Sequence, residues 1–224
     1  MSSIAYRTAG QLNDAMLRVY NYMFLAIVIS GVVSYFVGST PALVQFFFTG
    51  WIKWIVMFAP LAAIIGIIVA INSNPPKEIA LAMLVGFSAL MGLSFATIFA
   101  VFTIGSIAMA FMGAAVLFGT MSIYGYTTKR DLTSIGQFLF IGLIAVIIAS
   151  IINIFVGSSI MTMVISAVSV IVFTGLTAYD SQKIREMLSV DNNGTPEIMG
   201  ALVLYVNFIN LFLSLLQLFG SKKD

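Results

Sequence analysis

Uninterrupted apolar segments, each about 20 residues long, recur along the whole chain and limit what it can fold into. Hydrophobic residues make up 61% of the 224 residues and charged residues 8%, and the mean hydropathy is +1.10. A soluble domain of this length could not bury so much apolar surface, whereas a bilayer requires only that the backbone satisfy its hydrogen bonds internally. The alternating pattern of a membrane β-barrel is missing. We therefore predict an all-α integral membrane protein.

The apolar segments predict seven transmembrane helices in a single domain that covers residues 1–224. The predicted spans are residues 19–37, 52–71, 79–101, 106–126, 137–156, 160–179 and 198–219. Polar, Gly and Pro residues separate most of them, as expected of loops. The links near residues 103–105 and 157–159 are very short and uncharged, so we expect tight turns between antiparallel helices there.

The distribution of positive residues predicts the orientation. With seven crossings, the face of the N-terminus collects seven Lys and Arg residues and the other face three, which favours a cytoplasmic N-terminus and an external C-terminus. A re-entrant last segment would instead bring Lys222 and Lys223 inside and make the count nine against one. That segment has no interior Pro to break a helix, so we expect a full crossing.

The residue types that are missing exclude several kinds of chemistry. The sequence has no Cys and no His, so it cannot form a disulfide, a typical zinc site or a Ser/His catalytic pair. A net charge of +2, spread over several loops, gives no basis for nucleic-acid binding. We expect a protein that is not an enzyme, has no cofactor and has the lipid bilayer as its main partner.

One carboxylate stands at the end of the sixth apolar segment, in the sequence TGLTAYDSQKI of residues 174–184. Ionisable groups near bilayer depth are costly and usually line a polar cavity, pair with another group or carry an ion. On a helix, Thr177 and Lys183 would share a face with this residue, Asp180. Asp180 is therefore a candidate for an ion path or gate, and the simpler alternative is a local ion pair with Lys183 at the water interface.

The last apolar segment carries a stripe of polar side chains. Asn207, Asn210, Ser214 and Gln217 follow one another at intervals of three or four residues, so they lie along one side of a helix. Such side chains do not belong against lipid, where their hydrogen bonds would be unmet. The stripe predicts either interhelical hydrogen bonding or a polar path that ends near Asp180. We expect the Asp180 carboxylate to lie near Asn207 or Asn210.

These segments resemble a known family. TGLTAYDSQKI and ALVLYVNFINLFLSLLQLFG, residues 201–220, are similar to the C-terminal signature of the Bax inhibitor family, also called the transmembrane Bax inhibitor motif proteins. SIYGYTTKRDLTSIGQFL, residues 122–139, and Asn153 are similar to its middle section. The resemblance implies a bacterial-type member, in a bacterial inner membrane, whose central last helix is wrapped by six others. It also implies a calcium leak that is controlled by two buried carboxylates.

One of those two carboxylate positions corresponds to Asp180, and the other corresponds to Asn207. An Asp with an amide cannot share a proton as two carboxylates do, although both side chains offer oxygen atoms to a hard cation. We therefore expect Asp180 as a calcium contact, with Thr177, Asn207, Asn210 and Ser214 along the ion path or gate. Calcium would be a permeant ion. The alternative is a non-conducting regulatory protein that binds partner membrane proteins.

Overall fold

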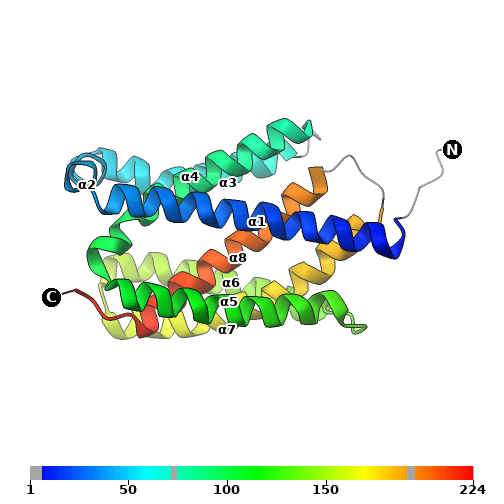
Figure 1. Ribbon diagram of the computed structural model, residues 1–224. Helices are drawn as coiled ribbons and strands as arrows, with labels where there is room; N and C mark the ends of the chain where they lie inside the picture. Colours follow the sequence, from blue (N-terminus) through cyan, green and yellow to red (C-terminus); the bar gives the residue numbers. More distant parts are fainter. Residues whose placement is uncertain (1–6, 72–74, 191–194, 224) are drawn as a thin grey trace. The chain divides into compact units, whose positions relative to one another are not determined.

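The computed structural model describes residues 7–71, 75–190 and 195–223. Within these ranges the chain forms eight α-helices: α1 (Ala9–Gly38), α2 (Pro41–Phe48), α3 (Ile52–Ile71), α4 (Lys77–Val101), α5 (Ile104–Thr127), α6 (Thr133–Val156), α7 (Ser159–Leu188) and α8 (Thr195–Phe219) (Figure 1). They divide into two compact units. Unit 1 holds α1 to α4, α8 as far as Leu202 and the tail from Lys222, and unit 2 holds α5 to α7 and residues 203–221.

The all-α prediction is confirmed, and each of the seven predicted spans lies within a helix. Among the described residues, six helices are long and apolar enough to cross a membrane: α1, α4, α5, α6, α7 and α8. Helices α2 and α3 meet at an angle of 78° and would make a seventh span if the bent pair counted as one. The links of residues 102–103 and 157–158 are the tight turns that were predicted, and Gly157 takes a left-handed φ of 66° in the second.

Helix α1 begins ten residues before the predicted span. Thr8 and Gln11 form a capping box there, in which Thr8 N donates to Gln11 Oε1 over 2.8 Å and Gln11 N donates to Thr8 Oγ1 over 3.4 Å. The first turns are polar on one side and bury Ala15 and Met16 on the other. An apolar-run criterion misses such an amphipathic start, although the T-x-x-Q pattern was visible in the sequence.

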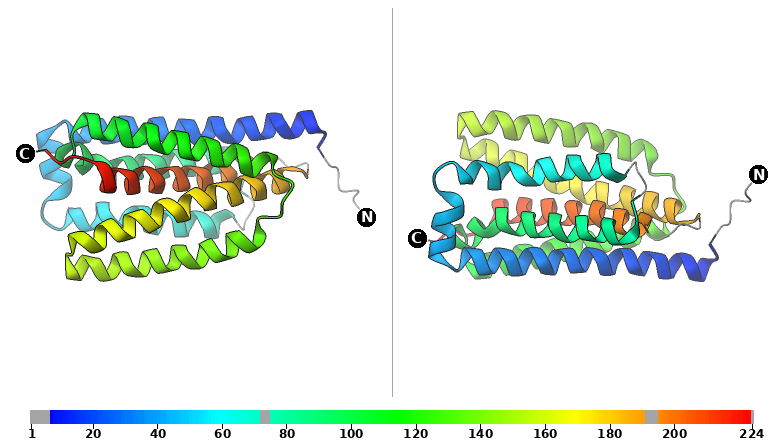
Figure 2. Two further views of the ribbon diagram at one scale, coloured as in Figure 1. Left: turned by 90° about the horizontal axis from the view of Figure 1, so that it is seen from below. Right: turned by 90° about the horizontal axis from the view of Figure 1, so that it is seen from above.

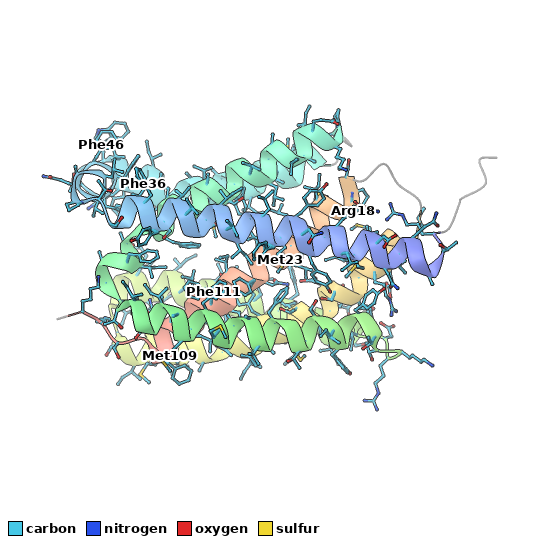
Figure 3. The ribbon with its side chains drawn as sticks, viewed as in Figure 1. Arg18, Met23, Phe36, Phe46, Met109 and Phe111 are labelled. Carbon is cyan, nitrogen blue, oxygen red and sulfur yellow. The ribbon has the colours of Figure 1, made fainter. Side chains whose placement is uncertain are left out.

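Helix α2 is not among the predicted elements, because it lies between the predicted spans of residues 19–37 and 52–71 and is too short to cross a membrane. Pro41 suits the first position of a helix, where its missing N–H costs nothing. Figure 2 shows α2 lying across the end where α1 finishes and α3 begins. None of its residues is buried. Phe46 on α2 and the nearby Phe36 on α1 are 58% and 63% exposed (Figure 3), as apolar side chains that face lipid should be.

In unit 1, two close contacts join α4 to its neighbours. Gly92 lies so near the backbone of Ser30 on α1 that a Cβ would come within 2.6 Å of the Ser30 carbonyl oxygen. Pro60 in α3 cannot donate to the carbonyl of Val56, four residues earlier. The hydroxyl of Ser94 on α4 donates to that carbonyl over 2.7 Å, so a hydrogen bond between helices replaces the missing one within the helix.

In unit 2, α5 packs closely on α7 and also contacts α8. A Cβ at Gly125 would clash with the backbone of Ala178, and one turn away Ser122 Oγ lies 2.9 Å from Ser181 Oγ. Phe208 on α8 makes edge-to-face contacts with Phe111 and Phe118 of α5, with ring centroids 5.3 and 5.7 Å apart. Figure 3 shows Phe111 turned toward α8.

The C-terminal tail lies against the turn between α4 and α5. Lys222 pairs with Phe102 in an antiparallel bridge, and Thr103 N donates to Ser221 O over 3.1 Å. Lys223 Nζ donates to the carbonyl of Phe99 over 2.8 Å, which caps the C-terminal end of α4 with a positive charge. The end of the chain is therefore on the same side as this turn.

Candidate functional site at the end of α7

Four consecutive residues near the end of α7 each contact a different neighbour in unit 2. Their directions differ because successive helical residues point about 100° apart. Tyr179 packs its ring where Gly136 of α6 leaves space, and Asp180 binds Asn207 of α8. Ser181 meets Ser122 of α5, and Gln182 holds the loop between α5 and α6. Residues 179–182 of α7 therefore contact α5, α6, α8 and the loop between α5 and α6.

The expected contact between the two signature segments is present. Asn207 Nδ2 donates a hydrogen bond of 2.7 Å to Asp180 Oδ2. Asn207 is 5% exposed, and Asp180 is partly buried. No described residue donates a hydrogen bond to the second carboxylate oxygen, Oδ1. The site therefore contains one carboxylate oxygen that is not engaged by a described residue and, on the neighbouring side chain, an amide carbonyl, and both are possible ligands for a cation.

The local ion pair with Lys183 is not formed among the described residues. Lys183 Nζ lies instead 3.2 Å from Tyr179 Oη and 5.5 Å from the centre of the Tyr179 ring. The neighbouring cation Arg185 donates to the carbonyl of Tyr126 at the end of α5. Both cations are thus engaged elsewhere, and Asp180 has an amide, not a cation, as its partner.

The other predicted residues are not brought together with Asp180 by any described hydrogen bond. Thr177 is fully buried, and its hydroxyl donates to the carbonyl of Phe173 in its own helix over 2.7 Å. Asn210 and Ser214 likewise donate to Val206 O and Asn210 O, four residues earlier in α8, over 2.8 and 2.7 Å. Gln217 is exposed.

Sequence reasoning missed the role of Gln182. Its Oε1 accepts a hydrogen bond of 2.9 Å from Leu132 N, and its Nε2 donates one of 2.8 Å to Arg130 O. One buried amide therefore fixes both edges of the loop between α5 and α6. The available signal in the sequence was that Gln182 lies two residues after Asp180, in the segment TGLTAYDSQKI. Its partners are about 50 residues away in sequence, so only the tertiary structure shows the pairing.

A charged cluster in unit 1 was also missed. Arg18 of α1 makes two hydrogen bonds with Glu197 in the first turn of α8, Nε to Oε2 over 2.8 Å and Nη2 to Oε1 over 2.9 Å (Figure 3 labels Arg18). Arg7 Nη2 lies 3.3 Å from Glu197 Oε1. Glu197 is only 2% exposed, so its charge depends on these guanidinium groups.

The described residues contain no cluster of three or more Asp, Glu, Cys or His side chains that could hold a metal ion. Calcium prefers six to eight oxygen ligands at about 2.3–2.6 Å. Asp180 and Asn207 supply two such side chains. An ion that met only these would retain most of its water, which suits brief contact better than tight binding.

Comparison with known proteins gives a consistent result over nearly the whole chain. Residues 12–224 match the family model described as inhibitor of apoptosis-promoting Bax1. An inner membrane protein of Escherichia coli strain K12, YbhL, is 37% identical over 227 residues, which cover 99% of this chain and 97% of that protein. Uncharacterized proteins of Rickettsia prowazekii and Caulobacter vibrioides are 38% and 37% identical, over 95% of this chain and 92% and 90% of their own lengths.

Proposed function

This chain belongs to the Bax inhibitor family, and on that premise we propose that it is a passive ion-conducting membrane protein, a calcium leak controlled around Asp180 and Asn207. The observation that carries the proposal is the 2.7 Å contact between the Asp180 carboxylate and the Asn207 amide, made inside membrane-length helices. A carboxylate kept there without a cation partner is costly, and a passing cation would offset that cost.

The chemistry at this point favours a divalent cation that passes and does not stay. Asp180 supplies negative charge with one oxygen unengaged, and the Asn207 carbonyl is a neutral oxygen ligand. Conduction requires attraction strong enough for entry and weak enough for release. In this proposal the protein is not an enzyme and has no resident cofactor, because calcium is its permeant ion.

For the membrane arrangement we propose seven crossings, with α3 as the second, a cytoplasmic N-terminus and an external C-terminus. Two contacts support a full crossing by α8. The starts of α4 and α8 lie together, because Thr195 Oγ1 donates to Pro75 O over 3.1 Å, and their ends lie together, because Lys222 pairs with Phe102. A Lys on the external side has a structural role here, because Lys223 caps the C-terminal end of α4.

A central position of the last helix is supported by its burial. In the most apolar 18-residue stretch of α8, 72% of the residues are buried, against 6–33% in the corresponding stretches of the other candidate spans. The YbhL name suggests a bacterial inner membrane.

The test is calcium flux into proteoliposomes that contain only the purified protein. We expect wild type to admit calcium down its gradient and Asp180→Asn to reduce the rate. Asp131→Asn is the matched control, because Asp131 is an exposed carboxylate in the α5–α6 loop. Flux no faster than in protein-free liposomes, for wild type and both variants, would reject the leak.

A second function, a non-conducting regulator that binds partner membrane proteins, is favoured by one observation. The side-chain donors of Asn210 and Ser214 are satisfied within α8, so the polar stripe needs no water in order to be stable. This alternative predicts no flux from the pure protein, and recovery of other membrane proteins with it after crosslinking in native membranes.

A further inference from the structure

Helix α7 carries its own polar stripe, which leads along the helix to Asp180. Its members are Thr162, Ser166, Ser169, Thr177 and Asp180, at intervals of three, four or eight residues. On an ideal helix they fall within an arc of about 80°. Ser166, Ser169 and Thr177 are 6%, 5% and 0% exposed, so the stripe is an inward face of the helix.

The hydroxyls of this stripe are not all satisfied in the same way. Ser169 and Thr177 donate to the carbonyls four residues earlier, over 2.8 and 2.7 Å, as such residues commonly do in membrane helices. Ser166 is equally buried. Thr174 Oγ1, which lies about 60° outside the arc of the stripe, is buried and has no hydrogen-bond partner among the described residues. Unpartnered hydroxyls in a low-dielectric interior cost free energy unless water or an ion reaches them.

One apolar side chain interrupts the stripe. Phe173 lies on the same arc, between Ser169 and Thr177, and is 6% exposed. Toward the start of α7 the stripe begins at Thr162, whose Oγ1 accepts a hydrogen bond of 2.8 Å from Asn153 of α6. Phe173 therefore separates the hydroxyls near the start of α7 from Thr177 and Asp180.

We propose that this face of α7 lines the path of the hydrated cation and that Phe173 closes the path as a hydrophobic constriction. The inference rests on the proposed leak and adds the lining and the barrier to it. Hydroxyl oxygens whose protons are donated to the backbone still present lone pairs to a hard cation. A bulky apolar side chain across such a path excludes water, and an ion cannot cross where its hydration shell cannot follow.

The first experiment compares calcium flux in proteoliposomes for truncations at two neighbouring positions. Phe173→Ala should raise the flux about tenfold or more. Val172→Ala is the matched control, because Val172 is 4% exposed on the same helix but points away from the stripe. Ser166→Ala should lower the flux, whereas Ser150→Ala should not, because Ser150 is a hydroxyl on α6 that donates to its own helix. Equal effects of Phe173→Ala and Val172→Ala would overturn the constriction.

A second experiment reads the path without measuring flux, and uses the absence of native Cys. A hydrophilic thiol reagent added on the side where α7 begins should modify Ser166→Cys. It should modify Thr177→Cys only when Phe173→Ala is also present. Val168→Cys should stay unmodified, because Val168 is on another face and a thiol in hydrocarbon does not ionise.

The two readouts separate the inference from the proposed function. If wild type leaks and Asp180→Asn reduces the leak, but Ser166→Cys resists the reagent, the path runs elsewhere and only this inference fails. If no variant conducts while Ser166→Cys and Thr177→Cys respond as expected, the hydrated path stands and the leak is rejected. Modification of Thr177→Cys regardless of residue 173 would overturn the role of Phe173.

Discussion

Asn207 donates a 2.7 Å hydrogen bond to Asp180, so an amide takes the place where the family pattern implied by the sequence has a second carboxylate. The two residues lie on α7 and α8 and are 27 positions apart in the sequence. The hydrogen bond fixes the orientation of the Asp180 carboxylate without contributing a second titrating group. The consequences for pH dependence can be measured directly.

Asn207→Asp should make calcium flux depend more strongly on pH than it does in wild type. Two carboxylates at this distance lose their protons in coupled steps, which adds a titration that an Asp and an amide lack. The measurement is a flux series between about pH 5 and pH 8 for both proteins. A sharp switch in wild type that Asn207→Asp leaves unchanged would reject the coupled pair as the source.

The loop carboxylate Asp131 should not contribute to that series. Hydrogen bonds from the Thr133 side chain and from the Thr133 backbone hold the pKa of Asp131 below its usual value. A carboxyl with a lowered pKa is ionised above it, so Asp131 stays charged throughout the series. Asp131→Asn should therefore give the same pH profile as wild type.

Arg18→Gln should destabilise the protein by about 1–3 kcal/mol, because it removes the two hydrogen bonds that the half-exposed Arg18 donates to the buried Glu197. Arg7→Gln should also destabilise the protein, since Arg7 Nη2 lies 3.3 Å from Glu197 Oε1. Thermal unfolding in detergent measures both, and Lys129→Gln in the exposed α5–α6 loop is the control. Equal midpoints for all three variants would contradict a structural role for the pair.

Gly125→Ala should destabilise by about 1–3 kcal/mol, because the new methyl group would force α5 away from the Ala178 backbone. Gly119→Ala is a matched control on the same helix, where nothing lies within 4 Å of the added Cβ. It should be neutral or slightly stabilising, since Ala favours helix by about 1 kcal/mol relative to Gly. The same unfolding assay compares the two.

A Cys at Ser221 should react with a membrane-impermeant thiol reagent added outside intact cells. This result follows from seven crossings and a cytoplasmic N-terminus, and no native Cys competes for the reagent. Labelling from the cytoplasmic side alone would instead support an α8 that re-enters. Such labelling would also place the α4–α5 turn inside, because the tail is bound to that turn.

The amino-acid sequence is enough to establish that the protein is helical and lies in a membrane, because hydropathy acts locally and needs no partner. It also establishes where most spans lie and singles out Asp180 as a charge at the end of an apolar segment. Local capping at Thr8 and Pro41 was written in the sequence too, but an apolar-run criterion does not detect the amphipathic start of α1 or the short α2.

Which polar groups meet depends on how the helices pack, and the sequence does not give that packing. The stripe of α8 predicted four polar neighbours for a path, yet only Asn207 reaches Asp180, while Asn210 and Ser214 bond to their own helix. Periodicity gives the face on which a side chain lies, but a hydroxyl or amide can satisfy itself on its own backbone or on another helix with similar free energy. The choice depends on how closely helices approach, and contacts such as Gly125 against Ala178 set that distance.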